Sequence, residues 1–426
     1  MTKYILKKIS YGILVLWGVV TLVFAIFSIN PGDPAAMLLG QRADEEAIEQ
    51  VRRELALDLP WGKQYALYIN DISPISLHSE NTESRVYIDK AKYNYAQLID
   101  FGDKVLVIKS PYLRRSYQSK KQVSEIIAEA MPGTVVLAVG AIFFALVFGI
   151  LLGVLTAVQK GRFIDGFSLF AAVLGMSAPS FFSAIIISWI GGYLWSVQTS
   201  LPAIPVVFGL IALAVSFFRE PRTWIKSAEW LIKGVLIGLA LIVLNSLAVL
   251  LFDFNFLLFG DAALTLPGTG LGMTGSLYDV DVFTGEYLAL SNLILPMITL
   301  GIRPLAIVVQ LTRNALLEEL SKDYTRTARA KGLSPNAVVF KHALRNALNP
   351  VVTAVSGWFA SMLAGAVFVE FVFNWKGLGL QVFQSLQNDD FPVIMGSVLV
   401  IAASFVVINI FVDVIYGLLD PRVRVS

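Results

Sequence analysis

The sequence has no cysteine, two histidines and little charge. The absence of cysteine excludes disulfide frameworks, thiolate metal sites and cysteine nucleophiles. With only His78 and His342 available, a histidine-built metal site is not expected either. Charged residues make up 15% of the chain and hydrophobic residues 56%. This composition is too apolar for a soluble protein of 426 residues, so a lipid bilayer is the expected environment.

The motifs of nucleotide hydrolysis and membrane proteolysis are also missing. The only Gly-Lys pair, Gly62 and Lys63, is followed by Gln64 and forms no Walker A loop. Neither H-E-x-x-H nor G-x-S-x-G occurs in the chain. We therefore expect no enzyme activity, cofactor or metal, and no nucleic-acid partner.

Eight apolar stretches approach the roughly 20 residues that a membrane span needs. They are residues 9–28, 134–158, 167–194, 204–218, 231–252, 293–311, 351–373 and 393–419. The fourth is short, and a re-entrant or interfacial segment is the alternative reading for it. The first stretch is expected to be an uncleaved anchor, because no small-residue cleavage pattern follows it.

The distribution of basic residues indicates one orientation for these spans. Basic residues precede span one and follow spans two, four, six and eight, which places all of them on one side. Residues 253–291, on the other side, carry five acidic residues and no basic one. Because lysine and arginine gather in cytoplasmic loops, both termini are predicted to be cytoplasmic. The same sidedness accounts for the acidic Asp279, Asp281 and Glu286 without a cation site.

Ionisable side chains are nearly missing from the interior of the expected spans. Glu370 and Asp413 lie near span ends, where a solvated or hydrogen-bonded structural role is expected. Ion-coupled transporters usually place carboxylates or histidine at the bilayer midplane. A transporter with this sequence would therefore draw its energy from elsewhere.

Residues 29–130 are the one part able to form a subdomain outside the membrane. Residues 44–70 have helical spacing, and Asp44 suits the N-cap position. Residues 85–89 and 104–109 are predicted to be strands. The segment is either a lid over the outer mouth or a docking platform for an extracytoplasmic partner.

Small residues in the spans favour close helix packing, and a proline interrupts the third span. Gly149 and Gly153, and the series Gly357, Ser361 and Gly365, favour close helix packing, with a moving interface as the alternative. Residues 177–181 interrupt the third span. Ser177 and Pro179 mark either an ordinary kink or a hinge that lines a pore.

A polar island over residues 323–350 separates two apolar stretches. Residues 316–331 are predicted to be helical, and Gly332 suits the position just past a helix end. Ser334 could cap a following helix, with Pro335 preventing simple continuation. Two short helices joined by a glycine turn offer a docking surface, although such a charge run is often only a solvated face.

This island resembles the EAA loop of bacterial ABC importer permeases, in particular the B-type permease subunit of the dipeptide, oligopeptide and nickel branch. The resemblance is carried by residues 323–332 and 342–351. Further matching pieces are residues 4–8, 31–35, 113–117, 177–181, 369–379 and 419–422. Arg326 stands where the general pattern has glutamate, and Arg345 where it has proline; both are similar to the peptide branch.

The resemblance implies an all-α polytopic fold with about eight transmembrane helices, six of a type I permease core and an inserted pair. The expected parts are an anchor (1–28), an extracytoplasmic α+β segment (29–130) that looks expanded over residues 72–107, and a core (131–426). The core contains the inserted pair at about 203–257 and a cytoplasmic coupling loop at about 312–350. The coupling residues implied are Asp323, Tyr324, Arg326, Thr327, Ala328, Arg329, Ala330, Lys331 and Gly332.

The implied assembly contains a homologous second permease, two cytoplasmic ABC ATPases and an extracytoplasmic substrate-binding protein, in the bacterial inner membrane. The expected function is half of the translocation pathway of an ATP-driven peptide importer. An alternative is a scaffold or sensor that recruits a soluble partner or anionic lipid through the basic loop without transport. A membrane enzyme is a more distant alternative. The sequence does not distinguish dipeptides, oligopeptides and nickel as cargo.

Overall fold

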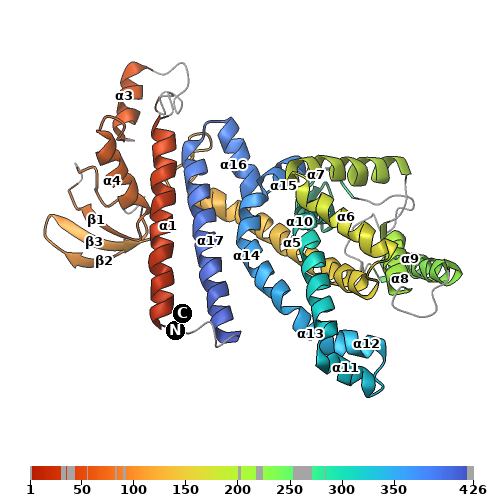
Figure 1. Cartoon of the computed structure of the whole chain (residues 1–426). Coiled ribbons are helices and arrows are strands. Elements are labelled where there is room, and N and C mark those ends of the chain that lie inside the picture. Colours follow the sequence, from red (N-terminus) through yellow and green to blue (C-terminus); the bar gives the residue numbers. More distant parts are fainter. Residues whose placement is uncertain are drawn as a thin grey trace. The chain divides into compact units, whose positions relative to one another are not determined.

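The computed structural model is mostly helical, with a small sheet near the N-terminus (Figure 1). It describes residues 2–29, 35, 44–54, 56–81, 84–89, 93–199, 203–216, 224–252, 271–283 and 285–419. The chain divides into two compact units, which are described separately below. One comprises residues 1–131 and 381–426, and the other comprises residues 132–380.

Five described helices are long and apolar enough to cross a membrane, or six if one bent pair forms a single span. The five are α1 (Thr2–Ile29), α5 (Val123–Val158), α9 (Trp224–Phe252), α10 (Ser291–Ser321) and α17 (Phe391–Leu419). The bent pair is α6 (Phe163–Ser177) and α7 (Ser180–Ile187), with the π-helix η1 (Ser188–Thr199) continuing α7.

Two of the eight expected spans fall short by length. Helix α8 (Ala203–Ser216) has 14 residues and α14 (Asn349–Gly365) has 17, whereas a span needs about 20. Helix α14 begins at a proline-containing turn and ends at Gly365, and α15 (Val367–Val372) starts after Ala366. The structure by itself therefore supports five or six spans.

Small residues let α5 and α10 approach closely. A Cβ atom added to Gly149 would lie 2.7 Å from Cγ1 of Val308, and one added to Gly153 would lie 2.6 Å from Cβ of Thr312. The pair predicted from the sequence thus serves helix packing. Gly357 differs, since nothing in the described chain lies within 4 Å of its Cβ position. The side chain of Ser361 and the surroundings of Gly365 lie outside the described part of the chain.

The expected inserted pair consists of α8 and α9, which pack against each other. A Cβ atom on Gly209 would lie 2.8 Å from Cγ2 of Val235, and one on Gly238 would lie 2.5 Å from Cα of Pro205. Glycines on both helices therefore set the close approach. Residues 217–223 between the two helices, which include Arg219 and Arg222, lie outside the described part.

The N-terminal unit has an apolar core between α1, α4 (Trp61–Ile72) and α17. Val20, Phe24, Tyr68 and Met395 form it, and the Phe24 ring stacks on Tyr68 at 5.6 Å. In Figure 1 the red α1 and the blue α17 run side by side. Burial of aromatic surface is a main stabilising contribution here.

The single helix expected over residues 44–70 is instead two helices, α3 (Glu45–Glu54) and α4. Ala56 has a positive φ of 59°, and Pro60 precedes the first turn of α4. Proline at this position cannot donate the hydrogen bond that a continuous helix requires. The helical spacing was correct on each side of this break and misleading across it.

The sheet has three antiparallel strands in the order β1-β3-β2. They are β1 (Ile75–Ser79), β2 (Tyr95–Asp100) and β3 (Lys104–Lys109). The strand predicted at residues 104–109 is confirmed, and the one predicted at residues 85–89 is wrong. Tyr87 makes only an isolated bridge to Ser79, while Arg85 forms two hydrogen bonds to Asp58 at 2.6 and 2.7 Å, which tether this segment to the α3–α4 connection. A further hairpin joins β4 (Tyr278–Asp281) and β5 (Gly285–Leu288).

One matching piece of sequence, residues 113–117, has a structural role in the N-terminal unit. The hydroxyl of Ser116 and the backbone N–H of Tyr117 both donate to the carboxylate of Asp390, which is buried. Two other pieces, residues 31–34 and 420–422, lie outside the described residues, as do Asp253, Asp261, Arg422 and Arg424.

Candidate functional site

The expected coupling helix is α11 (Asp323–Ala330). The single helix predicted over residues 316–331 is wrong, because α10 ends at Ser321 and the extended residue Lys322 separates it from α11. The hydroxyl of Thr325 donates to the carbonyl oxygens of Leu320 at 2.9 Å and of Lys322 at 2.7 Å. The last turn of α10 is therefore fastened to the first turn of α11, and the two helices meet at a defined corner. Figure 1 shows α11 and α12 close to that end of α10.

A polar cluster reinforces the corner from outside. Tyr324 donates to Oε2 of Glu319 at 2.5 Å, and the Nζ of Lys322 donates to Oε1 of Glu319 at 2.6 Å. Asn346 donates to the Tyr324 hydroxyl at 3.3 Å. Desolvation and the hydrogen bond to Glu319 raise the pKa of Tyr324 above its ordinary value, so its hydroxyl stays a donor at neutral pH.

Helix α11 has one packed face and one exposed face. Thr325 and Ala328 are buried, and the remaining candidate residues on both sides of them are exposed. The exposed candidates are Asp323, Tyr324, Arg326, Thr327, Arg329, Ala330, Lys331 and Gly332. Arg326 makes only a 3.5 Å ion pair with Asp323, whose side chain is almost fully exposed. Since such surface pairs contribute little to stability, the cations are available to another molecule.

The turn after α11 has the predicted conformation. Gly332 has φ +80°, its N–H donates to Arg329 O, and the N–H of Leu333 donates to Ala328 O. These two bonds form a Schellman motif, in which glycine is favoured because of the positive φ. Ser334 then accepts from the N–H of Ala337 at 3.4 Å, which confirms the predicted cap.

Three short elements complete the loop and bury its inner side. They are α12 (Pro335–Ala337), the π-helical turn η3 (Val338–Ala343) and α13 (Leu344–Ala347). Val339, Ala343 and Ala347 pack with Leu316 of α10 and Val154 of α5 in one buried cluster. Displacement of the loop would therefore be transmitted to two long helices.

The motif at residues 369–379 surrounds a buried carboxylate. Glu370 accepts hydrogen bonds from the Thr134 hydroxyl at 2.7 Å and from the N–H of Leu380 at 2.9 Å. A Cβ atom on Gly377 would lie 2.5 Å from this carboxylate, so the position requires glycine. Trp375 is fully buried and donates its indole N–H to Gly133 O at 2.9 Å. Glu370 therefore has the hydrogen-bonded structural role that the sequence predicted; the side chain of Asp413 lies outside the described residues.

An ion pair joins α6 to α10. Arg313 donates through Nε to Oδ1 of Asp165 at 2.6 Å and through a terminal nitrogen to Oδ2 at 2.8 Å. The N–H of Gly161 donates to the same carboxylate at 2.9 Å. Two parallel bonds fix both distance and orientation. This contact connects the C-terminal half of α10 with the first turn of α6, the helix that ends at Ser177.

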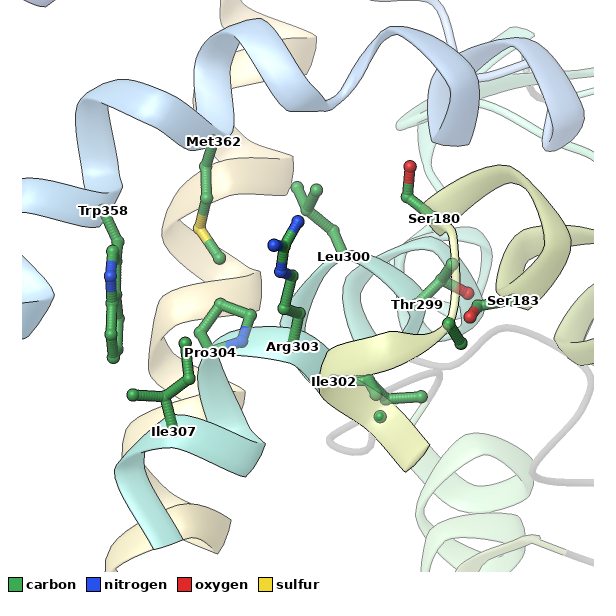
Figure 2. Close-up of a pocket in the computed structure, with 12 residues that line it drawn as sticks. Ser180, Ser183, Thr299, Leu300, Ile302, Arg303, Pro304, Ile307, Trp358 and Met362 are labelled. Carbon is green, nitrogen blue, oxygen red and sulfur yellow. The ribbon is translucent and has the colours of Figure 1, made fainter. Parts of the chain in front are cut away.

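The third expected span is broken at residues 177–179. Helix α6 ends at Ser177, Ala178 is extended, and α7 begins after Pro179 at a bend of 113°. A cavity of about 390 Å³ lies at this break. Its lining includes Ala178, Ser180, Ser183, Thr299, Arg303, Trp358 and Met362 (Figure 2). Ser177 and Pro179 shape the break but are not among the lining residues.

Arg303 on α10 is a residue that the sequence reasoning missed. It is the only charged residue between Ser291 and Thr312, and this was the signal available in the sequence. An arginine at the centre of a membrane helix costs about 2.5–3.5 kcal/mol on insertion scales. Within the part of the chain that the structure describes, its guanidinium has no ion pair or hydrogen bond. Such residues mark functional sites more often than structural ones.

Comparisons with known proteins agree with these features. Residues 237–425 match the family of binding-protein-dependent transport system inner membrane components, and residues 1–82 match the N-terminal part of such membrane components. The chain is 30% identical to the dipeptide transport system permease protein DppB of Escherichia coli (strain K12), over 100% of this chain and 99% of the relative. It is 31% identical to DppB of Haemophilus influenzae over the full length of both, and 28% identical to the glutathione transport system permease protein GsiC of Escherichia coli O1:K1, over 100% of this chain and 99% of the relative.

The long apolar helices and the broken span are those of a multi-pass membrane protein. The chain belongs to the family of inner-membrane permease components of binding-protein-dependent ABC transport systems. In such a system the ATPase resides in separate subunits, and a binding protein is a further component.

Proposed function

We propose that this permease forms half of the translocation pathway of an ATP-driven peptide importer. The cargo class is supported by the relatives, which are named as dipeptide and glutathione permeases over essentially their whole length. Dipeptides and glutathione share an extended peptide backbone and a free carboxylate. A cargo of short peptides is therefore preferred over nickel.

The two-faced helix α11 is the observation that carries the coupling proposal. Its inner residues Thr325 and Ala328 are buried, and its outer face presents Arg326, Arg329 and Lys331 beside the exposed Tyr324. Such a helix can seat in a cleft of an ATPase by electrostatic attraction and by apolar contact. The fixed corner with α10 would convert movement of the ATPase into movement of the spans.

The proposed topology has both termini and the coupling loop (about 312–350) in the cytoplasm, with an anchor at residues 1–28 and an extracytoplasmic segment at 29–130. The permease core covers residues 131–426, including the inserted pair at about 203–257. All eight apolar stretches would cross the membrane, six of them as a type I core. The basic residues then lie on the cytoplasmic side, as topology rules require.

The proposed partners are a homologous second permease, two ATPases and a substrate-binding protein. The open space at Gly357 on α14 fits close packing of a second permease helix at that position. The sheet formed by β1, β2 and β3, with α3 and α4, is the expected platform for the binding protein. Ser177 and Pro179 are proposed to form the hinge of the broken span.

The direct test is transport in a strain that lacks this subunit, with short peptides and nickel compared. Peptide uptake that returns with the wild-type gene and not with a coupling-loop deletion would support the proposal. If the ATPases bind the membrane through this subunit while no substrate is transported, the scaffold or sensor alternative is favoured instead.

A further inference from the structure

The cavity at the broken span combines a cation with free hydroxyl groups. Arg303 projects from α10, while Ser180 and Ser183 belong to the first turn of α7. Figure 2 shows the Arg303 guanidinium between the Met362 and Leu300 side chains, with both serines lining the same cavity. The volume of about 390 Å³ falls within the range of about 300–1,000 Å³ that is typical of small-molecule sites.

Arg303 lies in the interior of α10, a helix long and apolar enough to cross a membrane. It is the thirteenth residue of α10, so it lies about 18 Å along the helix from Ser291 at 1.5 Å per residue. The residues around it, from Ser291 to Thr312, are otherwise uncharged. The Arg303 side chain itself is exposed in this chain.

The described part of the chain supplies no counter-ion for this charge. Arg313 is bound to Asp165 by two hydrogen bonds, whereas Arg303 has no such partner among the described residues. The hydroxyls of Ser180 and Ser183 also make no hydrogen bond to described residues. The hydroxyl of Thr299, by contrast, donates to Leu295 O at 2.8 Å.

The start of α7 adds to the positive character of the cavity. The break at Ala178 and Pro179 leaves the first N–H groups of α7 without partners inside the helix, and this end of a helix carries a partial positive charge. Discontinuous membrane helices of transporters direct such ends toward anionic groups of their substrates. The Arg303 guanidinium and the N-terminal end of α7 therefore both favour an anionic ligand.

We propose that Arg303 binds the carboxylate of the peptide cargo as it passes through the membrane, and that Ser180 and Ser183 bind its peptide groups. A planar guanidinium matches a carboxylate with two parallel hydrogen bonds. The inference rests on the proposed function, because it requires a peptide cargo. A transient ligand also explains why the cation has no permanent partner among the described residues.

The test uses the complete transporter, with its second permease, ATPases and binding protein, reconstituted in lipid vesicles. Uptake of alanyl-alanine is compared with uptake of its C-terminal amide for the wild type, Arg303→Gln and Arg303→Lys. We expect Arg303→Gln to lower the uptake of the free dipeptide about tenfold or more, as the loss of a charge-assisted bond predicts. Arg303→Lys keeps the charge and should retain more than about a third of the rate. Uptake of the amide should change less than about twofold.

Met362→Leu is the matched control, because it alters the same cavity at nearly constant volume and leaves the charge in place. Equal dipeptide uptake by wild type and Arg303→Gln would overturn the inference while the proposed function stands. Failure of Arg303→Gln to assemble with the other subunits would also overturn it, in favour of an ion pair with the second permease. A wild-type transporter that takes up no peptide would overturn the proposed function itself, and this inference with it.

Discussion

Two polar regions of this apolar chain, the Glu370 pocket and the outer face of α11, use their charges in opposite ways. Glu370 is fully buried, and its carboxylate accepts bonds from Thr134 and Leu380. Arg326 is largely exposed and has only a long ion pair to Asp323. A charge with internal partners holds the fold together, whereas a charge directed outward is available for recognition.

Arg303 belongs to neither group. It lies in the interior of a long apolar helix, yet its side chain is exposed and has no partner among the described residues. Three roles of a charge are thus distinguished by its surroundings and by its hydrogen-bond partners. Substitutions at Glu370 and around α11 are expected to separate the two extremes.

The largest effect is expected from Glu370→Ala. The substitution leaves the Thr134 hydroxyl and the Leu380 N–H without an acceptor, at about 1–3 kcal/mol for each buried group. We expect a clear loss of thermal stability in detergent, measured as the monodisperse fraction after heating. Glu370→Gln keeps one acceptor oxygen and should lose less. Unchanged stability of Glu370→Ala would show that the pocket is not structural.

The next effect is expected from Gly332→Val. Nothing lies within 4 Å of the Cβ position, so the effect comes from the φ of +80° and not from a clash. A left-handed conformation costs a residue other than glycine roughly 1–2 kcal/mol, which should distort the turn after α11. The protein should still insert, while the ATPases should co-purify poorly with it.

Gly102→Val is the matched control for that experiment. Gly102 has φ +86° in the turn between β2 and β3, again with nothing within 4 Å. The local strain is the same, but the position is remote in sequence from the coupling loop. Normal ATPase co-purification and transport with Gly332→Val would contradict the role of this turn.

A charge-reversed α11, Arg326→Glu with Arg329→Glu, should weaken ATPase binding and leave stability within about 0.5 kcal/mol, because both side chains are exposed. Binding is measured by co-purification over a range of salt concentrations. Arg53→Glu on the exposed face of α3 is the control. If the two variants bind the ATPases equally well, the outer face of α11 is only a solvated surface.

The smallest effect is expected from Thr325→Val. The new side chain has a similar shape but cannot donate to Leu320 O or Lys322 O, a loss of about 1 kcal/mol. The corner between α10 and α11 should loosen, and amide hydrogen exchange over residues 323–330 should become faster. Exchange rates equal to those of the wild type would mean that the corner is held by apolar packing alone.

Much of the local structure was predictable because it depends on neighbouring residues. The end of α11 at Gly332 and the cap at Ser334 follow from local backbone preferences, and both are confirmed. The strand at residues 104–109 followed from its alternating pattern. The helix expected over residues 44–70 failed at Pro60. The strand expected at residues 85–89 failed because residues 84–87 form a turn, in which the N–H of Tyr87 donates to Ser84 O.

The sequence by itself determined that the chain enters a membrane, that it has no Walker A motif, and where the coupling helix ends. Those properties depend on composition and on spacing over a few turns. Only the tertiary structure decided which charges have partners: Glu370 meets Thr134 across 236 positions of the sequence, and Arg313 meets Asp165 across 148. It also showed that Arg303 meets no partner among the described residues and instead faces a cavity. Such contacts join distant segments, and no local preference encodes them.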